Sequence, residues 1–117
     1  MSGFETIDVF VSEANGVAVV SVTGEVDPFS APQLKRAVAS AIQPAVCEVA
    51  LDLAGVSFID ARGLDSVNEA GASVRESGRL FSITRRSLAV VRIEQLMAAI
   101  GQCGSDHPDG PPAIKAS

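Results

Sequence analysis

Hydrophobic and polar residues alternate over residues 5–11, near the start of the chain. One face of this segment carries Ile7, Val9 and Val11. A period of two predicts a half-buried β-strand. The pair Asn15–Gly16 follows, and a second β-rich run, VAVVSVTG, begins at Val17. Because Asn-Gly between two such runs is a strong hairpin signal, we expect an antiparallel return strand, with the chain leaving the sheet between Gly24 and Asp27.

The next segment has helical spacing. Between Ser30 and Pro44, apolar residues recur every three or four positions, at Leu34, Ala37, Val38, Ala41 and Ile42. Ser30 can cap this helix, and Pro32 fits its first turn, where a missing N–H is harmless. Pro44 is expected to stop the helix.

A long apolar run, CEVALDLAGVSFI, begins at Cys47 and predicts a third strand that leads straight to Asp60. Val49, Leu51 and Leu53 alternate with Glu48, Ala50 and Asp52, and Val56 and Phe58 follow after a glycine. We therefore expect the first three of these apolar residues to share one face.

Helical spacing returns after Asp60. The apolar stripe consists of Leu64, Val67, Gly71 and Val74. The helix is expected to end near Ser77, with Gly78 as the left-handed residue that closes it. A glycine on the buried stripe, Gly71, predicts that a strand approaches this helix closely.

The last predicted elements are a short strand, RLFSIT, which begins at Arg79, and a helix capped by Ser87. The helix runs through Leu88, Val91, Leu96 and Met97. Residues 101–117 are rich in Gly, Pro, Ser and Asp, and we expect a flexible tail there. Residues 1–100 then form one domain.

This order of elements predicts a small α/β fold. Two strand–helix–strand crossovers imply parallel pairing in the middle of the sheet, and the hairpin adds an antiparallel edge. We expect a mixed sheet of four strands, or five, with the helices mainly on one face.

Composition and charge narrow the classes of function. The chain has 117 residues, of which 47% are hydrophobic, and a formal net charge of −5. That balance argues against nucleic-acid binding, which needs clustered Lys and Arg. No apolar stretch approaches the ~20 residues of a membrane-spanning helix, so we expect no membrane insertion and a cytoplasmic location. Cys47, Cys103 and the single histidine, His107, do not form a ligand set, so neither a metal site nor a cofactor is expected.

The turn after the third strand, IDARGL, is the strongest candidate for a site. Asp60 stands where an N-cap belongs and can accept hydrogen bonds from the amides of Arg62 and Gly63. Arg62 lies in the first helical turn, where the helix dipole disfavours a cation by roughly 0.3–1 kcal/mol. It can offset this cost by pairing with Asp60 or Asp65. A tolerated surface arginine and a partner-binding arginine are both compatible with the pattern.

Three segments, VTGEVD from Val22, ALDLAGVSFIDARGL from Ala50 and LAVVRIEQLM from Leu88, resemble the STAS domain of bacterial anti-sigma factor antagonists. In that family, the resemblance implies binding to an anti-sigma factor of the protein-kinase type, which frees a sigma factor by partner switching. The kinase inactivates such antagonists by phosphorylating a serine directly after the acid. Here Ala61 stands at that position, and Arg62 occupies the place of a second Ser or Thr.

The resemblance therefore implies that the partner-binding part of the domain is present, whereas the serine that is phosphorylated in the family is missing. The implied partner-binding residues are Asp27, Asp60, Ala61, Arg62, Gly63, Leu64 and Ser66. The protein is then fixed in its binding form, is controlled by another input, or is a domain retuned to bind something else. The alternative class is a ligand-binding or transporter-accessory STAS module. We expect a monomer or a weak dimer.

Enzyme activity can be assessed from the residues alone. No base stands beside a nucleophile in the pattern, so we do not expect an enzyme.

The two cysteines offer a separate hypothesis. Cys47 begins the third strand and Cys103 follows the last helix, and in an alternating α/β layout these two places lie at the same end of the domain. A redox pair of these two thiols is therefore a hypothesis, against which stand the reducing cytosol and the partial burial expected for Cys47.

Overall fold

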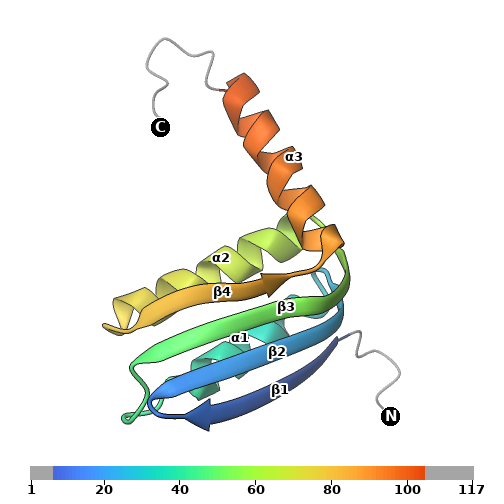
Figure 1. Ribbon diagram of the computed structural model, residues 1–117. Coiled ribbons are helices and arrows are strands. Elements are labelled where there is room, and N and C mark those ends of the chain that lie inside the picture. Colours follow the sequence, from blue (N-terminus) through green and yellow to red (C-terminus); the bar gives the residue numbers. More distant parts are fainter. Residues whose placement is uncertain (1–6, 105–117) are drawn as a thin grey trace.

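The computed structural model describes residues 7–104, with side chains up to residue 100. Its elements are β1 (Ile7–Ala14), β2 (Val17–Val26), α1 (Ala31–Ala41), β3 (Glu48–Ile59), α2 (Ala61–Glu76), β4 (Leu80–Arg86) and α3 (Leu88–Gly104). Figure 1 shows one sheet in the order β1-β2-β3-β4. β1 pairs with β2 antiparallel, and the other neighbours are parallel. The predicted mixed four-stranded α/β fold is confirmed.

The hairpin between β1 and β2 turns at the expected dipeptide. Asn15 and Gly16 both have positive φ, 55° and 82°. Two successive left-handed residues give the type I′ turn, whose twist matches that of the flanking strands. The turn sets the register of the hairpin, in which Ala14 lies opposite Val17 and Ile7 opposite Gly24.

The helices α1 and α2 cover one face of the sheet (Figure 1). Their buried stripes, which include Leu34 and Val38 of α1 and Val67 and Val74 of α2, join the buried side chains of the strands in one core. Gly71 lies on the buried side of α2, where an added Cβ would come within 2.7 Å of the Phe81 ring in β4. The predicted close approach of a strand to this glycine is therefore confirmed.

The long strand β3 does not keep the simple alternation expected from its sequence. Its buried apolar residues are Val49, Ala50, Leu51, Leu53, Val56 and Ile59. The register with β2 shifts twice, once beside Asp52 and Gly55 and again beside Phe58. Each shift gives β3 an extra residue and changes the face of the residues that follow. The first shift therefore turns Val56 inward, and the second restores the original alternation, so that Ile59 is buried and Phe58 is 48% exposed.

β2 is also longer than predicted. The chain does not leave the sheet at Gly24, because β2 pairs with β3 as far as Val26, which lies opposite Ile59. Gly24 has φ 107° and lies beside the second register shift, a conformation that suits a glycine in a distorted strand. This extension brings the end of β2 level with the end of β3.

The predicted cap of α3 is confirmed, since the Ser87 hydroxyl oxygen accepts a hydrogen bond from the Val90 amide at 3.3 Å. The side of α3 that packs on the core carries Ala89, Val90, Ile93 and Met97. Leu88 and Leu96, which also lie on this helix, are exposed.

The helix α3 runs to Gly104, past the expected start of the tail at residue 101. The remainder of the predicted tail, with His107, lies outside the described residues. Between residues 7 and 104, no helix is long and apolar enough to cross a bilayer.

Candidate functional site

The carboxyl ends of β2 and β3 lie side by side and present the two acids singled out in the sequence. Asp27 follows β2 directly, and Asp60 follows β3 directly. A hydrogen bond from the Asp60 amide to the Val26 carbonyl, at 3.4 Å, connects the two chain segments. Parallel pairing is what brings these loops together, because parallel strands end at the same edge of the sheet.

The loop after β2 is held by its own side chains. The Asp27 carboxylate accepts hydrogen bonds from the Phe29 amide at 2.9 Å and the Ser30 amide at 3.0 Å. Ser30 is buried; its hydroxyl donates to the Glu25 carbonyl at 2.7 Å and accepts from the Asp27 amide at 3.0 Å. Ser30 does stand at the N-cap position of α1, but its side chain makes no capping bond to the helix. The Ser30 side chain therefore does not cap α1 as expected, and its hydrogen bonds stabilise the loop before the helix.

The loop after β3 is fixed by helix capping. The Asp60 carboxylate accepts from the Gly63 amide at 2.7 Å, and within residues 7–104 no bond from the Arg62 amide to this carboxylate is found. Such a cap contributes ~1 kcal/mol relative to alanine. Gly63 is buried against the end of β2, where an added Cβ would overlap the Val26 carbonyl oxygen. The start of α2 is therefore fixed both by its cap and by the lack of a side chain at Gly63.

The predicted site residues divide into exposed and buried ones. Arg62 is exposed, and Ala61, Asp60 and Asp27 are half-buried. Gly63, Leu64 and Ser66 are buried. The Ser66 hydroxyl donates to the Arg62 carbonyl at 3.0 Å, one helical turn back. These three buried residues position the turn, and the exposed surface comes from their neighbours.

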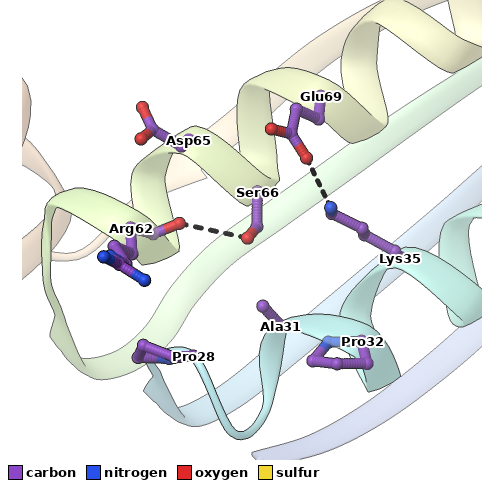
Figure 2. A pocket seen from close by; sticks show the side chains of 8 residues that line it. All are labelled: Pro28, Ala31, Pro32, Lys35, Arg62, Asp65, Ser66 and Glu69. Atoms are coloured by element: carbon purple, nitrogen blue, oxygen red, sulfur yellow. Dashed lines mark hydrogen bonds and ion pairs between the residues drawn. The ribbon is translucent and has the colours of Figure 1, made fainter.

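Arg62 borders an open groove of about 410 Å³ between α1 and α2. The groove is lined by Pro28, Ala31, Pro32, Lys35, Arg62, Asp65, Ser66 and Glu69. Figure 2 shows Lys35 reaching across from α1 to pair with Glu69 of α2. Arg62 forms no ion pair within residues 7–104, so the expected pairing with Asp60 or Asp65 is wrong. Among the described residues, the Arg62 guanidinium at one end of the groove is therefore without an ion-pair partner. The ion pair of Lys35 and Glu69 lies further along the groove.

Sequence reasoning missed two exposed aromatic residues at this edge. Phe29 is 87% exposed in the loop after β2, and Phe58 is 48% exposed one residue before the end of β3. Phe29 lies outside any periodic segment, so periodicity gives no signal for it. The only available signal was its place two residues after Asp27, in a loop between a strand and a helix. Phe58 was missed because simple alternation places it on the same face as Val56, whereas the second register shift lies between these two residues and separates their faces.

One ion pair that shifts the pKa of both its members lies away from this edge, between β3 and β4. The Arg85 guanidinium donates to the Asp52 carboxylate at 2.7 Å and 3.1 Å. These hydrogen bonds, together with a bond from the Ala54 amide, hold the pKa of Asp52 below its usual value and raise the pKa of Arg85. The pair is not part of the candidate site.

Two further hypotheses concern metal and thiol chemistry. The described part of the chain contains no cluster of three metal-ligating side chains. Cys47 is a free thiol and is exposed, contrary to the partial burial expected for it. It lies just before β3, whereas α3 leaves the sheet at the opposite end (Figure 1). This arrangement does not bring the two ends together, and the Cys103 side chain lies outside the described residues, so the redox pair stays a prediction.

The chemistry of this edge suits recognition. Its exposed groups are a cation, two aromatic rings and proline side chains, held by a hydrogen-bonded backbone. Aromatic residues and arginine are the types enriched in protein interfaces. Ala61, at the head of α2, has no hydroxyl to accept a phosphoryl group.

Comparisons with known proteins agree with this geometry. A family model described as "Mlab, STAS domain" matches residues 9–102. An anti-sigma-F factor antagonist, RsfB of Mycobacterium tuberculosis, is 28% identical over 100 residues, which cover 81% of this chain and 82% of that protein.

Two solved structures extend these comparisons. The crystal structure of an anti-sigma factor antagonist from Mycobacterium paratuberculosis is 27% identical with a TM-score of 0.69 and covers 83% of this chain and 82% of that one. The anti-sigma factor antagonist SpoIIAA, in its unphosphorylated form, is 21% identical with a TM-score of 0.62 over 78% of this chain and 81% of its own.

Proposed function

Because the chain belongs to the STAS domain family, we propose that it acts as an anti-sigma factor antagonist: it binds an anti-sigma factor and so frees a sigma factor. The observation that carries this proposal is the 28% identity with RsfB over 81% of the chain, the span that contains both acidic turns. The exposed side chains of Phe29 and Arg62, beside those turns, support it. The role is one of binding, without catalysis by this chain.

The proposed binding surface is the edge formed by the loop after β2 and the start of α2. We define it by Pro28, Phe29 and Arg62, which are exposed, and by Ala61, which is half-buried at the head of α2. Asp27 and Asp60 hold its backbone through their hydrogen bonds, and Gly63, Leu64 and Ser66 support it from below. The partner, an anti-sigma factor of the protein-kinase type, then meets a preformed surface, which lowers the entropy cost of binding.

Control by phosphorylation at the usual motif position is absent in this proposal. The family resemblance aligns Ala61 with the serine that the kinase modifies, and alanine offers no oxygen nucleophile. A phosphate there would add about −1.5 to −2 charge beside Asp60, which is how docking is blocked in the family. Arg62 supplies the opposite charge, so the surface stays competent for binding until another signal acts.

Titration calorimetry with each purified anti-sigma factor of the source organism tests the proposal. We expect one of them to bind with a Kd below ~10 μM and to release its sigma factor in a competition assay. Phe29→Ala should weaken that complex at least ~10-fold, as for an aromatic anchor. Phe10→Ala is the matched control, because Phe10 is also exposed (69%) but lies on β1, away from the surface.

Two results would contradict the proposal. If no anti-sigma factor of the organism binds, the alternative class, a ligand-binding or transporter-accessory STAS module, takes its place. If binding occurs but Phe10→Ala weakens it as much as Phe29→Ala, the contact surface is assigned wrongly.

A further inference from the structure

The second half of α3 carries apolar side chains that no other described element covers. Leu96 and Ile100 are each 54% exposed, and Ala98 and Ala99 are exposed as well. Figure 1 shows this part of α3 extending beyond the sheet and the other two helices. A helix at the surface of a globular protein normally turns polar side chains to solvent. The tip of α3, residues 98–100, is therefore suited to burial against another surface.

A groove of about 310 Å³ lies at the root of the same helix, between α3 and the last residues of β3. Phe58, Ile93 and Leu96 supply its apolar lining. Arg92 also lines it, is exposed, and forms no ion pair within residues 7–104. The first half of α3 thus lines a groove, and its second half carries exposed apolar side chains.

We propose that the groove receives the tip of α3 from a second copy of this chain, so that the two α3 helices pack antiparallel about a twofold axis near Leu96. Four residues of helix span about 6 Å. An antiparallel pair centred at Leu96 sets Ile100 of each copy opposite Arg92 of the other, beside Phe58. Both grooves are filled at once, which is the self-complementary contact that a closed twofold dimer requires.

Charge favours this direction of packing. The carboxyl end of a helix carries a partial negative charge on its free carbonyls, which attracts a nearby cation. Antiparallel packing brings that end of α3 in one copy toward Arg92 of the other. Arg92 also contributes a long aliphatic stem, which packs against apolar neighbours while its charged group stays in water.

Other occupants fit the chemistry less well. Residues 105–117 contain only Ala113, Ile114 and Ala116 as apolar residues besides proline, too few to cover an apolar helix tip and a groove. An anionic membrane surface attracts helices rich in Lys and Arg, whereas α3 has one Arg and one Glu. A second copy supplies both an apolar tip that can fill the groove of the first copy and a groove that can receive the tip of the first copy.

Sedimentation analysis of the full chain from about 10 μM to 1 mM tests the dimer, a range chosen for a weak association. The average mass should rise from the monomer value of 12.0 kDa toward twice that value. Ile100→Glu and Phe58→Lys should each raise the dimer Kd at least ~10-fold, since each places a charge in the apolar contact. Leu80→Glu is the control, because Leu80 is 69% exposed at the start of β4, away from α3.

An equimolar mixture of Ile100→Glu and Phe58→Lys tests the reciprocal contact. In a mixed dimer, one groove keeps the native pair of Phe58 and Ile100, and the other brings the two substituted positions together with opposite charges. Association should therefore return to near the wild-type Kd. Circular dichroism and the Tm of each variant establish that it is folded. A wild-type mass of 12.0 kDa at every concentration, loss of the dimer in Leu80→Glu, or no recovery in the mixture of folded variants would each overturn the proposal.

Discussion

Gly63, in the first turn of α2, packs directly against the backbone carbonyl of Val26 at the end of β2. This contact fixes the distance between the two loops that form the proposed binding surface. Any side chain at Gly63 would push the start of α2 away from the sheet. The geometry of the surface therefore depends on a residue that is itself buried.

Gly63→Ala should lower both stability and binding. Overlap with a backbone atom cannot be relieved by a rotamer change, and we expect a loss of about 1–3 kcal/mol in the free energy of unfolding. Urea denaturation and titration calorimetry measure the two effects. Gly78→Ala is the matched control: Gly78 has φ 85° and open space around it, so the substitution should cost stability but leave affinity for the anti-sigma factor unchanged. Equal affinity for both variants would show that the position of the turn is unimportant for binding.

Arg62→Glu should slow association with the anti-sigma factor, most clearly at low salt, because Arg62 is an exposed cation without an ion-pair partner in residues 7–104. Stability should stay the same or rise slightly, since an acid suits the first turn of a helix. Stopped-flow kinetics and a melting curve give both values. Arg36→Glu makes the same charge change on the exposed side of α1, outside the groove. Equal slowing in both variants would assign the effect to net charge and not to Arg62.

The wild-type chain should remain unphosphorylated at the turn when incubated with its anti-sigma kinase and ATP. Ala61 has no hydroxyl, and the nearest ones are unsuited: Ser66 is buried and donates to the Arg62 carbonyl, and Ser57 donates to the Gly24 carbonyl at 3.2 Å. Ala61→Ser should gain one phosphate per chain and then lose affinity for the kinase. Phosphopeptide mass spectrometry measures the modification. Stoichiometric phosphate on Ser57 or Ser66 of the wild type would contradict this expectation.

The ion pair of Asp52 and Arg85 should make part of the stability depend on pH. Because the hydrogen bonds from Arg85 lower the pKa of Asp52 below 3.8 in the folded state, its stabilisation is complete above that value and is lost as pH falls through the folded pKa. The difference in unfolding free energy between wild type and Asp52→Asn should be small near neutral pH, since Arg85 is exposed, and should shrink further below about pH 4.

Arg85→Gln should reproduce the effect of Asp52→Asn, and the double variant should lose little more than either single one. Urea unfolding at a series of pH values measures all four proteins. A difference that stays constant from neutral to acidic pH would show that the carboxylate charge is not what stabilises this part of the sheet.

Most of the fold could be predicted from local signals in the sequence. The pair Asn15–Gly16 defines the hairpin because it adopts the two left-handed conformations of a type I′ turn. Spacing of apolar residues identified the buried stripes of α1 and α2, and the glycine on one stripe, Gly71, correctly indicated the strand against it. Asp60 was correctly identified as the cap of α2. Each of these features depends on a few residues that are close together in the chain, so each can be recognised from the local sequence.

Features that depend on pairing between distant segments were not predictable in this way. The register shifts in β3 arise from its fit to β2, and the second of them places Phe58 on the face opposite that of the buried Val56. The groove beside Arg62 exists only because α1 and α2 pack side by side on the sheet. Likewise the exposed tip of α3 follows from the direction in which that helix leaves the sheet. The sequence by itself determined the elements and their buried faces, because backbone conformation and burial periodicity are local properties. Only the tertiary structure decided which side chains meet at the proposed binding surface, because that depends on the packing of segments far apart in the chain.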